Sequence, residues 1–237
     1  MSNFEIPFEG LFYTASKIEQ KYDPNAPNYT PEHQILSVFA RWVFPRSGFE
    51  VYGEFARDDR HANFRDLISE PDQKSAFGLG FQKLLRRSAR HYTVLRAELV
   101  NARITYIGLL RLEQPFYQHD AGIHQGHTNR GIVLGSPLAE LAGLGSIVGL
   151  DFYQPDGRWT LEFTRDSHQQ PANWPFAQGA IFDTPNALRV ERLLFRHGSD
   201  FDAALTAVYE LNRNFARHDA LDLRLDLGAR VGLGSRR

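Results

Sequence analysis

The feature that most constrains the fold is an alternation of apolar and polar residues with a period of two. It is clearest over residues 221–231, where every second residue is Leu, Ala or Val and those between are Asp, Arg or Gly. Successive side chains of a β-strand point to opposite faces, whereas a helix would mix the two sets on every face. The alternation recurs over residues 49–58, 159–164 and 201–212. The sequence therefore predicts a sheet with one apolar face and one polar face.

Looser versions of the pattern extend this prediction along the chain. They cover residues 36–42, 77–84, 91–100, 144–152 and 188–195. With a further strand predicted over 8–18, we expect about nine or ten strands, many longer than the five or six residues typical of a soluble sheet. Tilted strands of about nine to eleven residues are the length that crosses a bilayer.

The connections between these strands alternate between tight and long. Tight turns that carry the Pro, Asp, Gly and Ser residues of hairpins are predicted at 44–48, 154–158 and 196–200, and residues 86–90 form a fourth short link. The long connections are 59–76, 101–143 and 167–187. We expect residues 1–34 to form an N-terminal strand and loop and residues 35–237 to form antiparallel barrel strands. All twelve prolines fall outside the proposed strands.

Aromatic residues bracket the tight turns on the apolar side, as Trp42, Phe44, Phe49, Phe152 and Trp159 illustrate. If the tight turns share one end, these rings form a belt of the kind found at a membrane interface. The alternative is that the rings pair across strands of a soluble sheet. The fold class we predict is all-β, an antiparallel transmembrane β-barrel.

Composition excludes other classes. The chain has 27 Lys and Arg against 28 Asp and Glu, so it is not a strongly basic nucleic-acid binder, and no nucleic-acid partner is expected. It contains no cysteine, which excludes a disulfide framework and a thiol nucleophile. The longest apolar run is residues 141–150, too short for the roughly 20 residues of a membrane helix.

Three segments follow one another in a recognisable order. They are Tyr-Gly-Glu-Phe-Ala-Arg-Asp-Asp at 52–59, Ser-Ala-Phe-Gly-Leu-Gly-Phe at 75–81 and His-Thr-Asn-Arg-Gly-Ile-Val-Leu-Gly-Ser-Pro-Leu at 127–138. In this order they resemble the capsule assembly Wzi family, most closely over residues 35–166. Members of that family are outer-membrane β-barrels of Gram-negative bacteria. The resemblance implies a protein that binds or anchors capsular polysaccharide or exopolysaccharide at the cell surface through its outer loops.

The resemblance covers part of the family's length. Family members are about twice as long, so the chain resembles their C-terminal half and is expected to form part of a larger barrel. The implied location is the cell outer membrane, with outer-membrane lipid and the barrel-assembly machinery as further partners. The first residues lack the cationic and apolar parts of a secretory signal, so we expect a truncated chain whose signal lies elsewhere. The last residues, Gly-Leu-Gly-Ser-Arg-Arg, differ from the aromatic end that barrel assembly uses.

Two of the long connections hold candidate polysaccharide-binding residues. These are Tyr117, His119, Asp120, His127, Asn129, Arg130 and Trp174. Rings of Tyr, His and Trp stack on a pyranose face, while Asp, Asn and Arg hydrogen-bond its hydroxyl and carboxylate groups. The alternatives are loops that plug the barrel or that anchor to its rim. The histidine spacing matches no zinc signature, so no metal or other cofactor is expected.

Four residues are predicted to form a polar network in the lumen: Glu50, Glu54, Arg57 and Asp58. The last three belong to the best-matching segment, and Glu50, Glu54 and Asp58 recur at even spacing. We expect their charges to pair with Arg41 or Arg96. A glycosidase would need two carboxylates about 5 to 10 Å apart. Residues four apart in a strand are separated by about 13 Å, so the spacing does not favour catalysis. No catalytic residue is predicted.

Three functions remain open from the sequence. The leading hypothesis is a polysaccharide-binding barrel without enzymatic activity. The alternative is a porin-like channel that passes small solutes through a charged lumen. A third hypothesis, an outer-membrane hydrolase, has no sequence motif in its favour, because the chain has no Gly-x-Ser-x-Gly segment.

Overall fold

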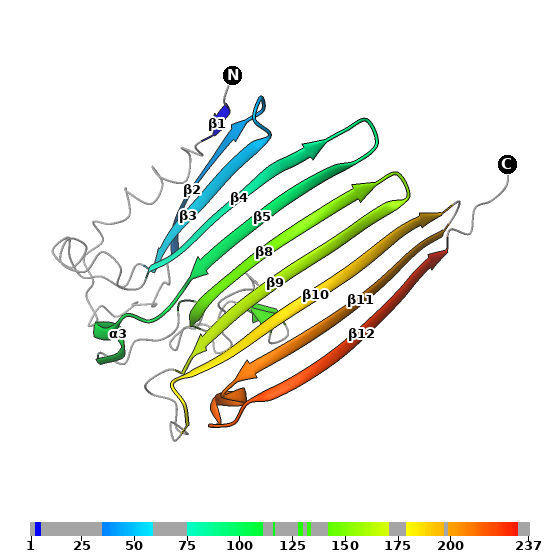
Figure 1. The fold of residues 1–237 in the computed structure, drawn as a ribbon. Helices are drawn as coiled ribbons and strands as arrows, with labels where there is room; N and C mark the ends of the chain where they lie inside the picture. Colours follow the sequence, from blue (N-terminus) through cyan, green and yellow to red (C-terminus); the bar gives the residue numbers. More distant parts are fainter. Residues whose placement is uncertain are drawn as a thin grey trace.

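The strands form a single antiparallel sheet whose spatial order follows the sequence (Figure 1). The structure, a computed structural model, describes residues 3–5, 35–58, 75–110, 116, 128–129, 132–133, 142–170, 179–196 and 199–231. The ten strands are β1 (Asn3–Glu5), β2 (Ile35–Phe44), β3 (Phe49–Asp58), β4 (Ser75–Arg87), β5 (Tyr92–Asn101), β8 (Gly143–Gln154), β9 (Gly157–Gln169), β10 (Phe182–Arg196), β11 (Ser199–Leu211) and β12 (Ala220–Val231).

Short elements lie in the connections. The helix α3 (Tyr106–Leu110) follows β5, and the strands β6 (Thr128–Asn129) and β7 (Ile132–Val133) pair with each other in a separate two-stranded sheet. A 3₁₀ turn, η1 (Arg213–Phe215), lies between β11 and β12. Among the described residues, no helix is both long enough and apolar enough to span a membrane.

The tight turns lie at one end of the sheet and the longer connections at the other (Figure 1). The links β2–β3, β4–β5, β8–β9 and β10–β11 are each four residues or shorter. The links β3–β4, β5–β8, β9–β10 and β11–β12 leave from the opposite end. The predicted alternation of short and long connections follows directly from antiparallel pairing in sequence order. We call the two ends the turn end and the loop end.

The strand register separates the residues into two faces. Leu225 lies opposite Leu205, which lies opposite Val190, and the row continues through Leu161 and Leu150. Odd-numbered positions of β12 therefore share a face with the apolar positions of its neighbours. The alternate positions carry most of the charged residues from β2 to β12; Arg57, Lys83, Arg165 and Arg192 are among the exceptions. The predicted two-faced sheet is confirmed.

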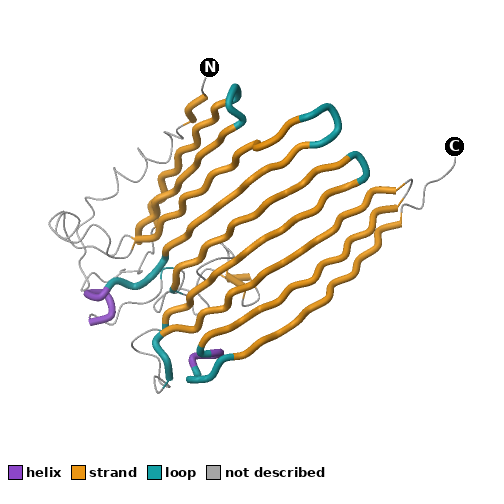
Figure 2. Tube along the Cα trace, in the orientation of Figure 1, coloured by secondary structure: helices purple, strands orange, loops and turns teal. Residues whose placement is uncertain are grey.

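The apolar face is uncovered in the described part of the chain. Figure 2 shows the sheet as one layer of strands. The leucines of β12 are the most exposed, at 66% to 74%, and large apolar side chains of β4, β9, β10 and β11 are also exposed. A soluble β-sandwich would bury such a face against a second sheet. This sheet has no second layer among its described elements.

The small buried apolar cluster lies elsewhere, at the loop end. It consists of Ala56, Ala76, Val100, Ala102 and Phe116, with Ile147 packed against it. Ala56, Ala76 and Val100 are at alternate positions to Phe55, Phe77 and Leu99, so they lie on the polar side of the sheet. The cluster therefore leaves the extended apolar face untouched.

The antiparallel all-β class is confirmed, whereas a closed barrel is not seen. The described strands form an open sheet with β1 and β12 at its two ends. Closure needs hydrogen bonds between the edge strands, and β12 pairs only with β11 within the described sheet. The strand expected over 8–18 lies outside the described residues.

The prediction that every proline avoids the strands is wrong at Pro185, which lies inside β10. Proline has no N–H to donate, so a central strand accepts it only where the ladder is interrupted. The pairing of β10 with β9 passes from Asp183 to Asn186, and Pro185 falls in this gap. The range 167–187 was expected to be a loop, but β9 extends into it as far as Gln169 and β10 begins within it at Phe182.

The β8–β9 turn depends on a glycine. Gly157 has a φ of 147°, and a Cβ built there would lie 1.9 Å from the carbonyl oxygen of Leu193. The neighbouring Asp156 carbonyl accepts a hydrogen bond from the Phe195 N–H at 2.8 Å. The turn therefore packs directly against the backbone of β10 and leaves no room for a side chain.

We predict that Gly157→Ala lowers the free energy of unfolding by at least about 2 kcal/mol, because it adds both backbone strain and a backbone clash. Gly78→Ala is the matched control, since its Cβ would meet no atom closer than 3.9 Å. Urea unfolding in detergent micelles measures both. Equal losses in the two variants would contradict the role assigned to the turn.

Candidate functional site

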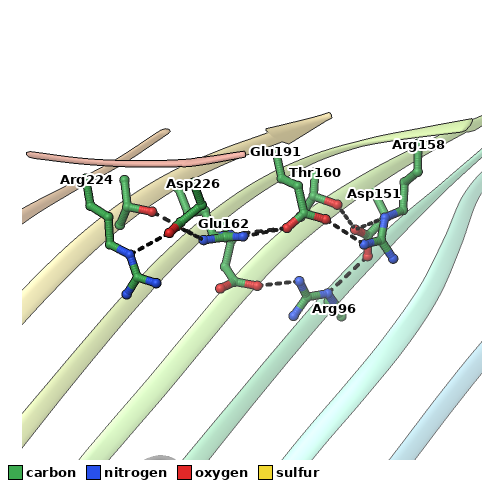
Figure 3. Close-up of polar contacts among 10 residues, drawn as sticks. Arg96, Asp151, Arg158, Thr160, Glu162, Glu191, Arg224 and Asp226 are labelled. Carbon is green, nitrogen blue, oxygen red and sulfur yellow. Dashed lines mark hydrogen bonds and ion pairs between the residues drawn. The ribbon is translucent and has the colours of Figure 1, made fainter. Parts of the chain in front are cut away.

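The polar face carries a continuous series of ion pairs that crosses the sheet from β5 to β12 (Figure 3). At its β5 side, Arg96 donates from Nε to Asp151 Oδ2 at 3.0 Å and from Nη2 to the carboxylate of Glu162. Arg96 thereby joins β5 to both β8 and β9. Asp151 Oδ1 in turn lies 3.9 Å from Arg158 Nε, which extends the series along β9.

Glu191 links the two halves of the series. Its Oε1 accepts from Arg158 Nη2 at 2.9 Å and its Oε2 from Arg189 Nη2 at 2.8 Å. Arg189 Nη1 then lies 3.4 Å from Asp226 Oδ2 on β12, and Asp226 Oδ1 accepts from Arg224 Nε at 2.7 Å. We call the whole set the charged ladder; its members are Arg96, Asp151, Arg158, Thr160, Glu162, Arg189, Glu191, Arg224 and Asp226.

The centre of the charged ladder is its most buried part. Asp151 is 5% exposed, and its Oδ1 also accepts a hydrogen bond from the Thr160 hydroxyl at 2.7 Å. A buried carboxylate is costly unless cations and donors surround it. Asp151 has two arginines and one hydroxyl, so both of its oxygens are satisfied. The strand alternation places all of these groups on one face.

A second polar group occupies β2, β3 and β5. Glu50 accepts from Nε and Nη2 of Arg41 at 2.9 Å each, which is a bidentate pair between β2 and β3. Tyr52 donates its hydroxyl to Glu98 Oε2 at 2.8 Å, which joins β3 to β5 across β4. The sheet leaves room for this bond at Gly80, where a Cβ would lie 2.4 Å from the Tyr52 ring.

Of the four residues predicted for a lumen network, Glu50 and Glu54 have separate partners. Glu50 pairs with Arg41, and Glu54 accepts a hydrogen bond from the Ser37 hydroxyl. Arg57 is buried near the loop end, and its position in β3 alternates with the polar-face residues, so it lies on the apolar face. The side chain of Asp58 lies outside the described residues.

The loop candidates for polysaccharide binding also lie outside the described residues. This holds for Tyr117, His119, Asp120, His127, Arg130 and Trp174. Asn129 is described only through its backbone, which pairs with Ile132 in the β6–β7 hairpin. The connections that contain all seven residues leave from the loop end of the sheet. Antiparallel topology places the strand ends that flank these connections at the same end of the sheet.

Most members of the charged ladder were missed by the sequence analysis. Arg96 was expected to pair with the β3 carboxylates, but it binds Asp151 and Glu162 instead. The alternation of side chains along each strand is enough to place these residues on the polar face. Which of them pair with one another depends on the register of five strands. A two-residue shift of any strand would exchange the partners, and single-strand patterns do not specify it.

Outside the strands, the β11–β12 connection contains an organised carboxylate. Asp219 accepts hydrogen bonds from the Asn212 backbone N–H at 3.1 Å and from the Tyr209 hydroxyl at 2.9 Å. These donors favour the ionised form, so they hold the pKa of the Asp219 carboxyl below its usual range. Asn212 and Asn214 adopt left-handed conformations in this connection, which asparagine tolerates well.

The chemistry of the described polar face is that of a charged, hydrogen-bonded surface. Within the described ranges, no three His, Asp or Glu side chains are placed to hold a metal ion. His168 Nε2 lies 3.1 Å from Asp166 Oδ2 near the loop end. Comparison of the chain with protein-family models, with curated proteins and with solved structures finds no match.

We predict that Glu191→Gln lowers the free energy of unfolding by about 2 kcal/mol, because it removes the carboxylate shared by Arg158 and Arg189. Glu50→Gln is the matched control and should cost about 0.5 kcal/mol, since it breaks one solvent-exposed pair with Arg41. Urea titration in detergent micelles compares the two. A Glu50→Gln loss as large as that of Glu191→Gln would contradict the central place of Glu191.

Proposed function

We propose that the chain forms the wall of an outer-membrane β-barrel that binds capsular polysaccharide or exopolysaccharide at the cell surface through its loop end. The uncovered apolar face of the sheet carries the proposal. The acyl chains of a lipid bilayer solvate such an apolar face without a second protein layer. A transmembrane barrel presents this pattern, with apolar residues outside and polar residues inside.

The strand lengths support a membrane location. Strands β2 to β12 of the main sheet have 10 to 15 residues each. A tilted strand needs about 9 to 11 residues to cross the hydrocarbon core, so each strand is long enough. All backbone groups of a spanning strand must be hydrogen-bonded, and the ladders on both sides of β3, β4, β5, β8, β9, β10 and β11 supply those bonds.

Strand direction supports closure. The described sheet has ten strands in strict antiparallel order, so its two edge strands, β1 and β12, run in opposite directions. Each edge therefore accepts a further strand, or the opposite edge, with the same antiparallel hydrogen bonding. Bacterial barrels with even strand numbers follow this rule. This antiparallel pairing at the edges is compatible both with closure of this chain alone and with its participation in a larger barrel.

The polysaccharide is proposed from the resemblance to the capsule assembly Wzi family together with the position of the connections. The candidate residues of 101–143 and 167–187 belong to connections that leave from the same end of the sheet. Their aromatic, amide and guanidinium groups suit a chain of acidic sugars. Outer-membrane lipid, polysaccharide and barrel-assembly machinery are the proposed partners, and the proposed activity is binding without catalysis.

We predict that the chain, reconstituted in lipid vesicles, binds an acidic capsular polysaccharide and that Arg130→Ala and Trp174→Ala each weaken this binding about tenfold. Arg46→Ala and Trp42→Ala are matched controls at the turn end and should bind as the parent does. Co-flotation of vesicles with labelled polysaccharide measures the affinity. Unchanged binding in both loop variants would remove these residues from the site.

The charged ladder favours a second candidate function, a channel for small solutes. Its members put both charge signs on the face that would line a hydrated interior, as porin walls do. Conductance across a planar bilayer separates the two functions. A barrel plugged by its loops passes no current, whereas a channel gives steps whose ion selectivity changes in Glu191→Gln.

A further inference from the structure

The turn end of the sheet carries an excess of unpaired positive charge. Its exposed arginines are Arg46, Arg86, Arg87, Arg90, Arg196 and Arg230. Within the described part of the chain, none of these six makes an ion pair or a side-chain hydrogen bond. The chain as a whole has a net charge of −1, so this is a local concentration of charge.

Few acidic groups offset the arginines at this end. Asp156 is already bound to Arg192, with 3.0 Å between its Oδ2 and Nη2. Asp200 lies opposite Arg230 in the β11–β12 register, and Asp202 lies two residues further along β11. At the loop end, by contrast, Arg213 is paired with two carboxylates. Its Nε lies 3.4 Å from Glu210 Oε2, and its Nη2 lies 2.7 Å from Asp222 Oδ2.

Aromatic rings lie at the same end of the sheet. Trp42 stacks on Phe44 with centroids 4.8 Å apart, and Tyr92 stacks on Tyr153 at 4.3 Å. The guanidinium of Arg192 lies 5.2 Å from the centre of the Trp159 ring. Each of these rings is within three residues of a tight turn. Trp42, Phe44 and Trp159 lie on the apolar face, where rings near a strand end mark the level of lipid headgroups, whereas Tyr92 and Tyr153 lie on the polar face.

A hollow on the apolar face adjoins this end. Its volume is about 430 Å³, and its lining comes from β10, β11 and β12. The lining consists of Arg192, Leu194, Phe201, Asp202, Ala203, Leu227, Gly228 and Ala229. Arg192 is already paired with Asp156, and Asp202 is the other charged residue of the lining. The remaining lining is apolar, which suits an acyl chain rather than a headgroup.

We propose that the turn end binds anionic phospholipid, with headgroup phosphates against its exposed arginines and acyl chains along the apolar face and its hollow. Arg86 and Arg196 are the strand arginines of this group whose register places them on the apolar face. The proposal rests on the membrane location proposed above and adds the lipid class and the orientation. Arginine near an anionic surface contributes about fivefold in affinity per residue, which makes the cluster selective over zwitterionic lipid. Arginine also suits phosphate because its planar donors bind two oxygens together.

The tryptophans provide a local probe of this lipid contact. The chain has three, Trp42, Trp159 and Trp174. Substitution Trp174→Phe leaves Trp42 and Trp159, both in the aromatic belt of the turn end. The protein is reconstituted in phosphatidylcholine vesicles that contain either brominated phosphatidylglycerol or brominated phosphatidylcholine in equal proportion. Bromine quenches only nearby tryptophan, so quenching reports which lipid contacts the turn end.

We expect brominated phosphatidylglycerol to quench more strongly, with a relative affinity about fivefold or more above that of brominated phosphatidylcholine. Arg86→Gln/Arg196→Gln should abolish most of this preference, because both arginines lie on the apolar face at the turn end. The control Arg165→Gln/Arg217→Gln removes the same charge from two exposed arginines at the loop end and should retain it. Circular dichroism of each vesicle sample confirms the β-structure.

Two results would overturn the proposal. Equal quenching by both lipids in the parent would show that the turn end has no preference for anionic headgroups. Equal loss of preference in the test and control variants would show a general charge effect. Absence of quenching by either lipid is a different failure, because it would contradict the membrane location itself.

Discussion

Continuous antiparallel hydrogen bonding between neighbouring strands is the constraint on which the rest of the structure depends. Because successive side chains alternate, a slip of one residue would invert a whole strand between the two faces. The register keeps Leu205 beside Leu225 on one face and Thr206 beside Arg224 on the other. The apolar face, the charged ladder and the separation of turn end from loop end all follow from this register.

The two faces require different surroundings. In water the uncovered leucines of β12 would drive association, since an exposed apolar edge strand pairs readily with other chains. In lipid the same leucines are solvated, while the polar face needs water or fixed partners. Asp151 shows how the polar face meets this need, because it is buried yet bonded to Arg96, Arg158 and Thr160. A wall between lipid and a hydrated interior satisfies both faces at once.

Alternation along single strands was enough to predict the antiparallel sheet, its two faces and the order of its connections. The end of β9 was placed too early and the beginning of β10 too late, because polar residues such as His168 and Asp183 still pair across the two strands there. Pro185 in β10 was unexpected, since a local gap in pairing is invisible in a sequence. The partners of Arg96 were also missed, because they depend on the register of several strands rather than on spacing within one. The loop candidates stay predictions.

The most direct test of the central claim is a scan of single cysteines along β12, which the absence of native cysteine allows. Leu223→Cys, Arg224→Cys, Leu225→Cys and Asp226→Cys are spin-labelled in lipid vesicles, and collision with oxygen is compared with collision with a water-soluble nickel chelate. The account predicts a period of two, with labels at 223 and 225 reached by oxygen from the lipid and labels at 224 and 226 reached by nickel. Equal nickel access at all four positions would contradict a sheet with lipid on one face.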